Sequence, residues 1–206
     1  ILILLFIQWT AAWSQVTDSV NVYDETQFLL KQTAQGRIYT GVNFGLGLGV
    51  RNDNVILDNS TVLVDFNIYP KAGVFVADQW LVGGGFDYLT SVATFDAGDE
   101  YRLSLRTISV FTRYYLTSGL FAELNYGWGN GEETYTNNNQ IANDGLLGKK
   151  LMGGIGIGNF WFDQFNFEIL LQYAVASGSY KNLPGTFTFS GLKISAGIGF
   201  CPNPKR

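Results

Sequence analysis

Two pairs of oppositely charged residues are spaced so that a strand hairpin would bring each pair together. Arg113 and Glu123 lie at equal distances from Ser118, and Lys71 and Asp87 lie at equal distances from Gln79. Residues equidistant from a tight turn face each other across the two strands of an antiparallel hairpin. The spacing therefore predicts two directly opposed ion pairs. Such pairs stabilise a fold or, in the alternative interpretation, line a path for protons or ions.

The composition excludes several kinds of catalysis. The chain has no His and a single Cys, Cys201. Ser-His-Asp and Cys-His mechanisms need an imidazole, and the usual cysteine-based metal sites need several thiolates. The glycine-rich stretches "GLGLGV" (45–50) and "GGIGIGNF" (153–160) superficially resemble nucleotide-binding loops, but no helical pattern follows either of them. We therefore predict no enzymatic activity, no metal and no cofactor, and we interpret Cys201 as a bystander near the C-terminus.

Acidic residues gather at two places, Asp96/Asp99/Glu100 and Glu132/Glu133. Neither group has the spacing of a calcium-binding loop. We interpret both as solvated ends of loops, where bridging cations near lipid phosphates are an alternative. The net charge is −4, so no basic surface indicates a nucleic-acid partner.

Alternation of side chains with period two predicts the strands that position these residues. In "GLFAELNYGWGN" (119–130), Leu124 and Trp128 fall on one face, and Glu123 and Asn125 fall on the other. An irregularity in the alternation between Leu105 and Ile108 predicts a β-bulge near Arg106. Runs of this kind predict strands at residues 37–50, 61–76, 81–94, 101–116, 120–130, 150–161, 165–177 and 186–200.

The connections between these runs alternate in length. After the second, fourth and sixth runs they are short, "ADQ", "TSG" and "FDQ", and the other connections are longer and polar. Short turns at one end and long loops at the other are typical of up-and-down barrels in outer membranes. The longest predicted loop, residues 131–148, is the best candidate for contact with an external partner, although an Asn-rich loop is also simply a soluble connection.

The composition of the two strand faces predicts which face meets lipid. The apolar faces carry large residues, whereas the opposite faces mix charges with glycines. Eight strands leave an interior barely wide enough for side chains, so the bulky residues belong outside. The expected polar lumen cluster is Asp65, Lys71, Asp87, Arg113, Glu123, Glu168 and Lys193. The aromatic residues expected in membrane girdles are Trp80, Tyr88, Tyr126, Trp128 and Trp161.

The N-terminal stretch "ILILLFIQWTAAWSQ" pairs an apolar run with small residues. This pattern is typical of a secretory signal peptide, here without the charged segment that normally begins one. We predict cleavage after Ser14. The predicted organisation is a signal peptide at 1–14, an N-terminal periplasmic segment at 15–36, a barrel at 37–200 and a C-terminal tail at 201–206.

Several hairpins resemble those of the small bacterial outer-membrane β-barrel proteins, the eight-stranded barrels of the OmpX and OmpA kind. The stretches are "YPKAGVFVADQWLVGGGFDY", "FTRYYLTSGLFAELNYGWG" and "GIGNFWFDQFNFEILLQY", and "GLKISAGIGF" resembles their aromatic-terminated last strand. The likeness departs where "CPNPKR" follows Phe200. It implies an all-β, eight-stranded antiparallel transmembrane β-barrel in the outer membrane of a Gram-negative cell. It also implies contact with lipopolysaccharide and with the barrel-assembly machinery.

These observations predict a non-enzymatic barrel with a structural role or a role in loop-mediated interaction. One alternative is a narrow gated channel for small solutes or ions. Another is a soluble periplasmic, lipocalin-like ligand binder, which requires an apolar lumen.

Overall fold

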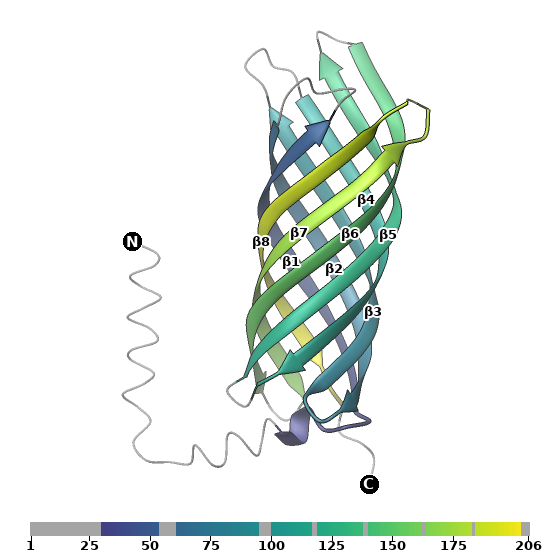
Figure 1. Cartoon of the computed structure of the whole chain (residues 1–206). Coiled ribbons are helices and arrows are strands. Elements are labelled where there is room, and N and C mark those ends of the chain that lie inside the picture. The colour runs from purple at the N-terminus through teal and green to yellow at the C-terminus, as the bar shows by residue number, and fades with distance from the viewer. Residues whose placement is uncertain are drawn as a thin grey trace, which may run out of the picture.

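The chain forms a closed eight-stranded antiparallel barrel (Figure 1). The computed structural model describes residues 30–53, 61–94, 100–116, 119–137, 140–161, 164–182 and 184–202. Every strand pairs with its neighbours in sequence, and β1 also pairs with β8, with Thr40 opposite Phe200. The strands are β1 (Ile38–Asp53), β2 (Thr61–Ala77), β3 (Trp80–Thr94), β4 (Glu100–Tyr115), β5 (Leu120–Asn137), β6 (Gln140–Trp161), β7 (Phe165–Tyr180) and β8 (Thr186–Phe200).

The predicted fold class and all eight predicted strands are confirmed. The prediction for the last strand matches β8 in both bounds. The alternation is regular, as in β7, where buried and exposed residues take turns from Phe165 to Ser177. This regularity follows from the period of two along a strand, which sends one set of side chains into the lumen and the other outward.

The predicted long loop at 131–148 is wrong. β5 continues to Asn137 and β6 begins at Gln140, so most of this segment is a hairpin that extends both strands. In Figure 1, β5 and β6 rise beyond their neighbours at the end opposite the tight turns. The segment Thr134-Tyr135-Thr136 explains the extension, because Thr and Tyr favour strands even where the surrounding residues are polar.

The predicted β-bulge near Arg106 is also wrong. The pairing of β3 with β4 runs without a shift from Leu105 opposite Leu89 to Ile108 opposite Phe86. Leu103 and Leu105 point into the lumen and are buried, whereas Arg106 and Ile108 point outward. The alternation of apolar and polar residues is irregular here because the lumen is apolar at the level of Leu103 and Leu105. Apolar residues therefore occupy both the inward and the outward face of β4.

The hairpin of β2 and β3 decides whether Lys71 and Asp87 face each other. Its connection is the two residues Asp78 and Gln79, with Gln79 at a positive φ of 67°, and the register shifts between Phe75 and Ala77. Lys71 therefore lies opposite Gly85 rather than Asp87. The expected direct pair of Lys71 and Asp87 is wrong because the turn is tighter than the three residues that symmetry about Gln79 assumes.

Both ends of the described chain lie at the tight-turn end of the barrel. A single helical turn at 30–32 packs there, with Gln32 and Thr33 buried. Arg37 donates hydrogen bonds to the side chain of Gln32 and to the carbonyl oxygen of Cys201. Cys201 is itself fully buried, with its thiol 3.6 Å from the carbonyl oxygen of Gln32, so it is part of this closure rather than a bystander.

Other predictions lie outside the described residues: the signal peptide, the segment at 15–29, the tail from 203 onward, and Asp96 and Asp99. They stay predictions. No helix in the described part of the chain is long and apolar enough to cross a membrane.

Candidate functional site

The outer face of the barrel is apolar over most of its surface. Ile155 is 69% exposed and Val62 is 64% exposed, and large apolar side chains point outward from every strand. Because exposed apolar surface of this extent is unfavourable in water, this face belongs against lipid. The predicted orientation of the apolar faces is therefore confirmed.

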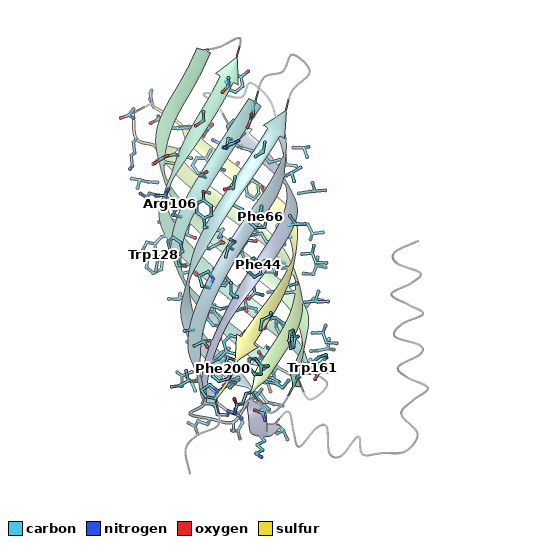
Figure 2. The ribbon with its side chains drawn as sticks, turned by 180° about the vertical axis from the view of Figure 1, so that it is seen from behind. Phe44, Phe66, Arg106, Trp128, Trp161 and Phe200 are labelled. Atoms are coloured by element: carbon cyan, nitrogen blue, oxygen red, sulfur yellow. The ribbon has the colours of Figure 1, made fainter. Side chains whose placement is uncertain are left out.

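The expected girdle aromatics all lie on this outer face. Trp80, Tyr126, Trp128 and Trp161 are exposed, and Tyr88 is partly exposed. Figure 2 shows Trp161 near the tight-turn end and Trp128 well above it. Their assignment to membrane girdles stays a prediction, which this separation into two levels supports.

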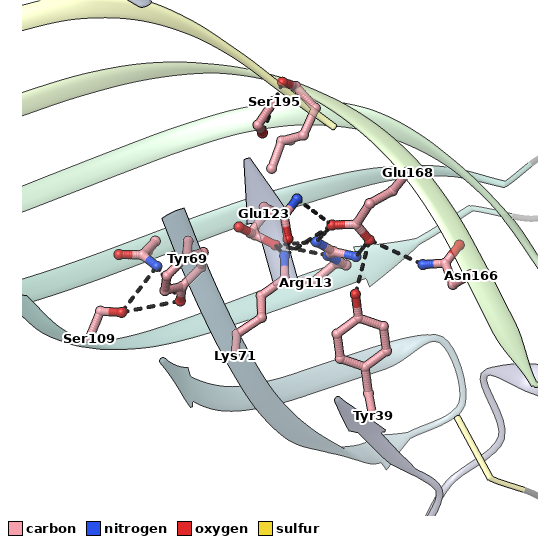
Figure 3. Close-up of polar contacts among 12 residues, drawn as sticks. Tyr39, Tyr69, Lys71, Ser109, Arg113, Glu123, Asn166, Glu168 and Ser195 are labelled. Carbon is pink, nitrogen blue, oxygen red and sulfur yellow. Dashed lines mark hydrogen bonds and ion pairs between the residues drawn. The ribbon is translucent and has the colours of Figure 1, made fainter. Parts of the chain in front are cut away.

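The predicted polar lumen is centred on a salt bridge between Arg113 of β4 and Glu168 of β7 (Figure 3). The two Nη atoms of Arg113 lie 2.5 and 2.8 Å from the two carboxylate oxygens of Glu168. Asn43 and Tyr39 from β1 also donate hydrogen bonds to this carboxylate, as does Asn166. A bidentate guanidinium–carboxylate pair fixes both partners in one orientation, so Glu168 joins strands that are not neighbours.

Glu123 and Lys71 complete this group, which we call the ion network: Lys71, Arg113, Glu123 and Glu168. Arg113 lies opposite Glu123 in the register of β4 and β5, as predicted, with an Nη–Oε distance of 2.5 Å. The Lys71 ammonium lies 3.0 Å from Glu123 and 3.1 Å from Glu168. All four side chains are fully buried, and two positive charges balance two negative ones.

A second polar layer lies above the ion network. Lys150 of β6 forms an ion pair with Asp87 of β3, and the Asn67 amide donates to Asp87 over 2.9 Å. Asp65 and Lys193 are also buried in the lumen and interact electrostatically. All seven residues of the predicted lumen cluster therefore point inward, and the structure adds Lys150, whose inward direction the period of two in β6 indicates.

A third ion pair was missed by the sequence interpretation. Arg51 donates to Glu133 over 2.5 Å and to the Tyr180 hydroxyl over 2.8 Å, and it also contacts the Tyr101 hydroxyl. Glu133 is therefore buried and paired, and the prediction that it is a solvated loop carboxylate is wrong. Extending the inward alternation beyond Gly49 and beyond Gly131 would have identified both charged residues.

Two apolar clusters close the lumen on either side of the charges. The inward residues of β2 show the order, with Phe75 lowest, then Lys71, then Asp65, then Leu63. The lower apolar cluster is Tyr39, Phe75, Leu81, Phe111, Tyr115, Phe121, Phe160, Leu170 and Cys201. The upper apolar cluster is Leu63, Leu89, Ala93, Tyr101, Leu103, Leu105, Leu146, Ala176, Tyr180, Phe187 and Phe189.

The arrangement that these charged groups adopt is therefore one of mutual neutralisation. The charged atoms of the ion network are shielded from water and already bound to one another. Within the described ranges, no group of three or more His, Cys, Asp or Glu side chains is arranged to hold a metal ion.

Solved structures share this architecture at very low sequence identity. Neisserial surface protein A matches with a TM-score of 0.54 and 8% identity over 79% of this chain and 96% of that one. Ail, the attachment invasion locus protein of Yersinia pestis, matches with a TM-score of 0.52 and 10% identity over 81% of this chain and 99% of that one. This chain has the fold of the small outer-membrane β-barrels. No protein-family model and no curated protein matches the chain.

The outer-membrane barrel fold explains why the outer face is apolar while the lumen holds charged residues. Closure leaves no strand edge along the paired region, so the backbone groups of the wall are hydrogen-bonded within the sheet, as a lipid environment requires. The outward apolar run of β7 extends from Phe165 to Val175, and a tilted membrane-crossing strand needs about 9–11 residues.

Proposed function

We propose that the protein is a non-enzymatic β-barrel of the bacterial outer membrane that does not conduct through its lumen. Its role is to support the envelope or to make contacts through the end that carries the long connections. The observation that supports this proposal most directly is the closed lumen. Fully buried ion pairs lie between two packed apolar clusters, and an aqueous path through the lumen would have to cross both clusters.

The alternative of a gated channel requires the ion network to open. Arg113 has a carboxylate on two sides and its guanidinium lies 3.9 Å from the centre of the Phe121 ring. Separating these groups would leave buried charges unpaired, which costs about 3–5 kcal/mol for each broken pair. The alternative of a soluble lipocalin-like binder requires a polar exterior and an apolar lumen, whereas the observed exterior is apolar and the middle of the lumen is occupied by charged side chains.

The surface that supports an interaction role is the hairpin of β5 and β6, which rises beyond the other strands (Figure 1). It replaces the loop that the sequence predicted at 131–148. Because it extends further than the other strands do, we place the contact surface on this hairpin.

A gel-mobility assay and a conductance assay test the proposal together. The purified chain is run in SDS with and without boiling, and we expect heating to shift its mobility, because a closed barrel resists SDS. The same protein in a planar bilayer is expected to give no steady single-channel current. A protein that is released by osmotic shock and shows no heat shift would contradict the membrane assignment.

The variant Glu123→Ala separates a closed barrel from a gated one. If the ion network is a gate, removing this carboxylate raises the current of a protein that still shows the heat shift. We expect no current in the variant, because the lower and upper apolar clusters remain. A reproducible current in Glu123→Ala would support the channel alternative.

A further inference from the structure

A groove of about 830 Å³ runs across the outer face of β5, β6, β7 and β8, above the apolar part of the wall. Its lining combines two aromatic rings, those of Trp128 and Phe187, with Leu147, one amide, one ammonium group and four hydroxyl groups. The outward-facing residues that line it are Trp128, Asn130, Leu147, Lys149, Ser177, Ser179, Thr186 and Thr188. Such a lining differs from the outer face nearer the tight-turn end, where large apolar side chains predominate.

The strand register places these groups side by side. Trp128 lies opposite Lys149, Lys149 opposite Ser177, and Ser177 opposite Thr188. Adjacent strands are about 4.8 Å apart, so the row from Trp128 to Thr188 covers three spacings, about 14 Å, which is long enough for a disaccharide. A second row, from Asn130 to Thr186, runs beside the first.

Two basic residues, Lys149 and Arg106, lie at the groove or next to it. Among the described residues, no carboxylate lies within ion-pair distance of Lys149 or Arg106. Arg106 lies opposite Asn130 on the neighbouring strand, and Figure 2 shows it beside Trp128 on the outer face. Glu132, also exposed, is the next outward residue of β5 above Asn130. The groove is therefore lined by one basic side chain, Lys149, and a second, Arg106, lies beside it on the neighbouring strand.

The surface immediately below the groove is apolar. The next outward-facing residues toward the tight-turn end are Tyr126 below Trp128, Leu151 below Lys149 and Val175 below Ser177. All three are exposed. These three residues also lie opposite one another in the register. Any molecule in the groove thus has hydrogen-bonding groups on its upper side and hydrocarbon directly below.

The wall behind the groove is thin, because glycines occupy the inward positions. Gly129 lies opposite Gly148, and Gly148 lies opposite Gly178. The ring of Phe187 fills the space on the lumen side, where a Cβ atom on Gly178 would come within 2.6 Å of it. The groove is therefore a depression built into the sheet and supported from inside.

We propose that this groove binds the phosphorylated saccharide head group of a glycolipid in the outer leaflet. The Lys149 ammonium binds a phosphate group, with Arg106 adding charge at the rim. The Ser and Thr hydroxyls of β7 and β8 bond to sugar hydroxyls, and the Trp128 ring packs against a sugar face. The acyl chains lie along Tyr126, Leu151 and Val175. This inference rests on the proposed function, because it needs the apolar wall to be in a membrane.

Native mass spectrometry of the detergent-purified barrel, titrated with diphosphorylated lipid A, tests the assignment. We expect lipid A to bind the wild-type barrel, and Lys149→Gln to weaken its binding about tenfold, the effect of losing one charge-assisted hydrogen bond. Arg102→Gln is the matched control. Arg102 is also an exposed, outward-facing basic residue, but it lies away from the groove and already pairs with Glu100 at 3.0 Å. We expect that variant to bind as the wild type does.

Two further probes identify the chemistry. Dephosphorylated lipid A is expected to bind about tenfold more weakly than the diphosphorylated form, because it lacks the phosphate that accepts the charge-assisted hydrogen bond from Lys149. Phosphatidylglycerol carries the phosphate without the saccharide, and equal binding of it would overturn the saccharide assignment. Equal binding of lipid A to Lys149→Gln and the wild type would overturn the site.

The heat shift in SDS is measured on every variant. A barrel that shows the shift but does not bind lipid A overturns this inference and leaves the proposed function standing. A wild-type protein that lacks the shift overturns both.

Discussion

The ion network and the Arg51–Glu133 pair are both fully buried in the same lumen, yet they are built differently. In the ion network, four charged side chains from β2, β4, β5 and β7 form ion pairs with one another. Glu168 alone accepts hydrogen bonds from residues of four strands. Arg51, in contrast, pairs with one carboxylate among the described residues, Glu133, and contacts hydroxyls and aromatic rings of the upper apolar cluster. The first is a crosslink across the barrel, and the second is a pair of charges that lies, within the described part of the chain, among the rings of the upper apolar cluster.

The difference shows how one lumen uses charge for two purposes. A buried ion pair surrounded by apolar groups contributes little net stability over hydrophobic residues of similar volume. A shared carboxylate differs, because removing Glu168 takes one ion-pair partner from two cations at once and leaves both of them on Glu123. Unfolding the barrel and its variants with urea in lipid vesicles tests this contrast.

We expect the largest effect from Glu168→Ala. Arg113 and Lys71 would both lose a buried carboxylate partner, and we expect the free energy of unfolding to fall by about 3–5 kcal/mol. Gln172→Ala is the matched control, since Gln172 is the second residue after Glu168 on the inward face of the same strand and is also buried. We expect about 1 kcal/mol for the control, and similar losses in the two variants would disprove a special role for the shared carboxylate.

Arg51→Met should cost less, about 3 kcal/mol, because the Tyr101 hydroxyl still hydrogen-bonds to Glu133. The double variant Arg51→Met/Glu133→Leu is the sharper test. It fills the site with hydrocarbon inside the upper apolar cluster, so we expect its stability to return to within about 1 kcal/mol of the wild type. A double variant as unstable as the single one would mean that the upper pair is itself a crosslink.

Tyr69→Phe tests the uncharged bonds beside the ion network. The Tyr69 hydroxyl lies 3.1 Å from Ser109 Oγ and 2.7 Å from Asn125 Nδ2. Removing it leaves a buried amide donor with a weaker partner, and we expect a loss of about 1–2 kcal/mol. Tyr126→Phe removes a hydroxyl from the outer face, and its stability should be unchanged within error.

The smallest expected effect concerns the base of the barrel. Burial raises the pKa of the Cys201 thiol, and the thiol is covered by the helical turn at 30–32. The reactive thiolate is therefore scarce in the folded protein. At pH 8 we expect maleimide labelling of the folded barrel to be at least about tenfold slower than in urea, with equal rates indicating an open base.

Much of the fold followed from the sequence, because side-chain direction along a strand depends only on parity. Parity placed Asp65, Glu168 and Lys193 in the lumen without knowledge of their neighbours. It also predicted that Arg113 faces Glu123, since a short turn fixes the register nearby. The same reasoning failed for Lys71 and Asp87, where the tighter turn and the register shift moved the strands by two positions.

The partners across the lumen could not be predicted. Arg113 meets Glu168, and Lys150 meets Asp87, between strands that are not adjacent. Which residues meet there depends on the tilt and stagger of all eight strands and on side-chain length. Arg51 and Glu133 escape the prediction for another reason: the residues around them have the polar composition of a loop, although β1 and β5 and their alternation continue through them.

The donors to Glu168 have a consequence for how the barrel assembles. Tyr39 and Asn43 come from β1, and β1 reaches β7 only through β8, the last strand made. No single hairpin can neutralise this carboxylate, and an open sheet that lacks its final strand would carry it into lipid without the bonds from β1. Joining the first strand to the last therefore completes the lumen chemistry and the wall in one step. A chain ending before β8 should stall as an unclosed intermediate outside the bilayer.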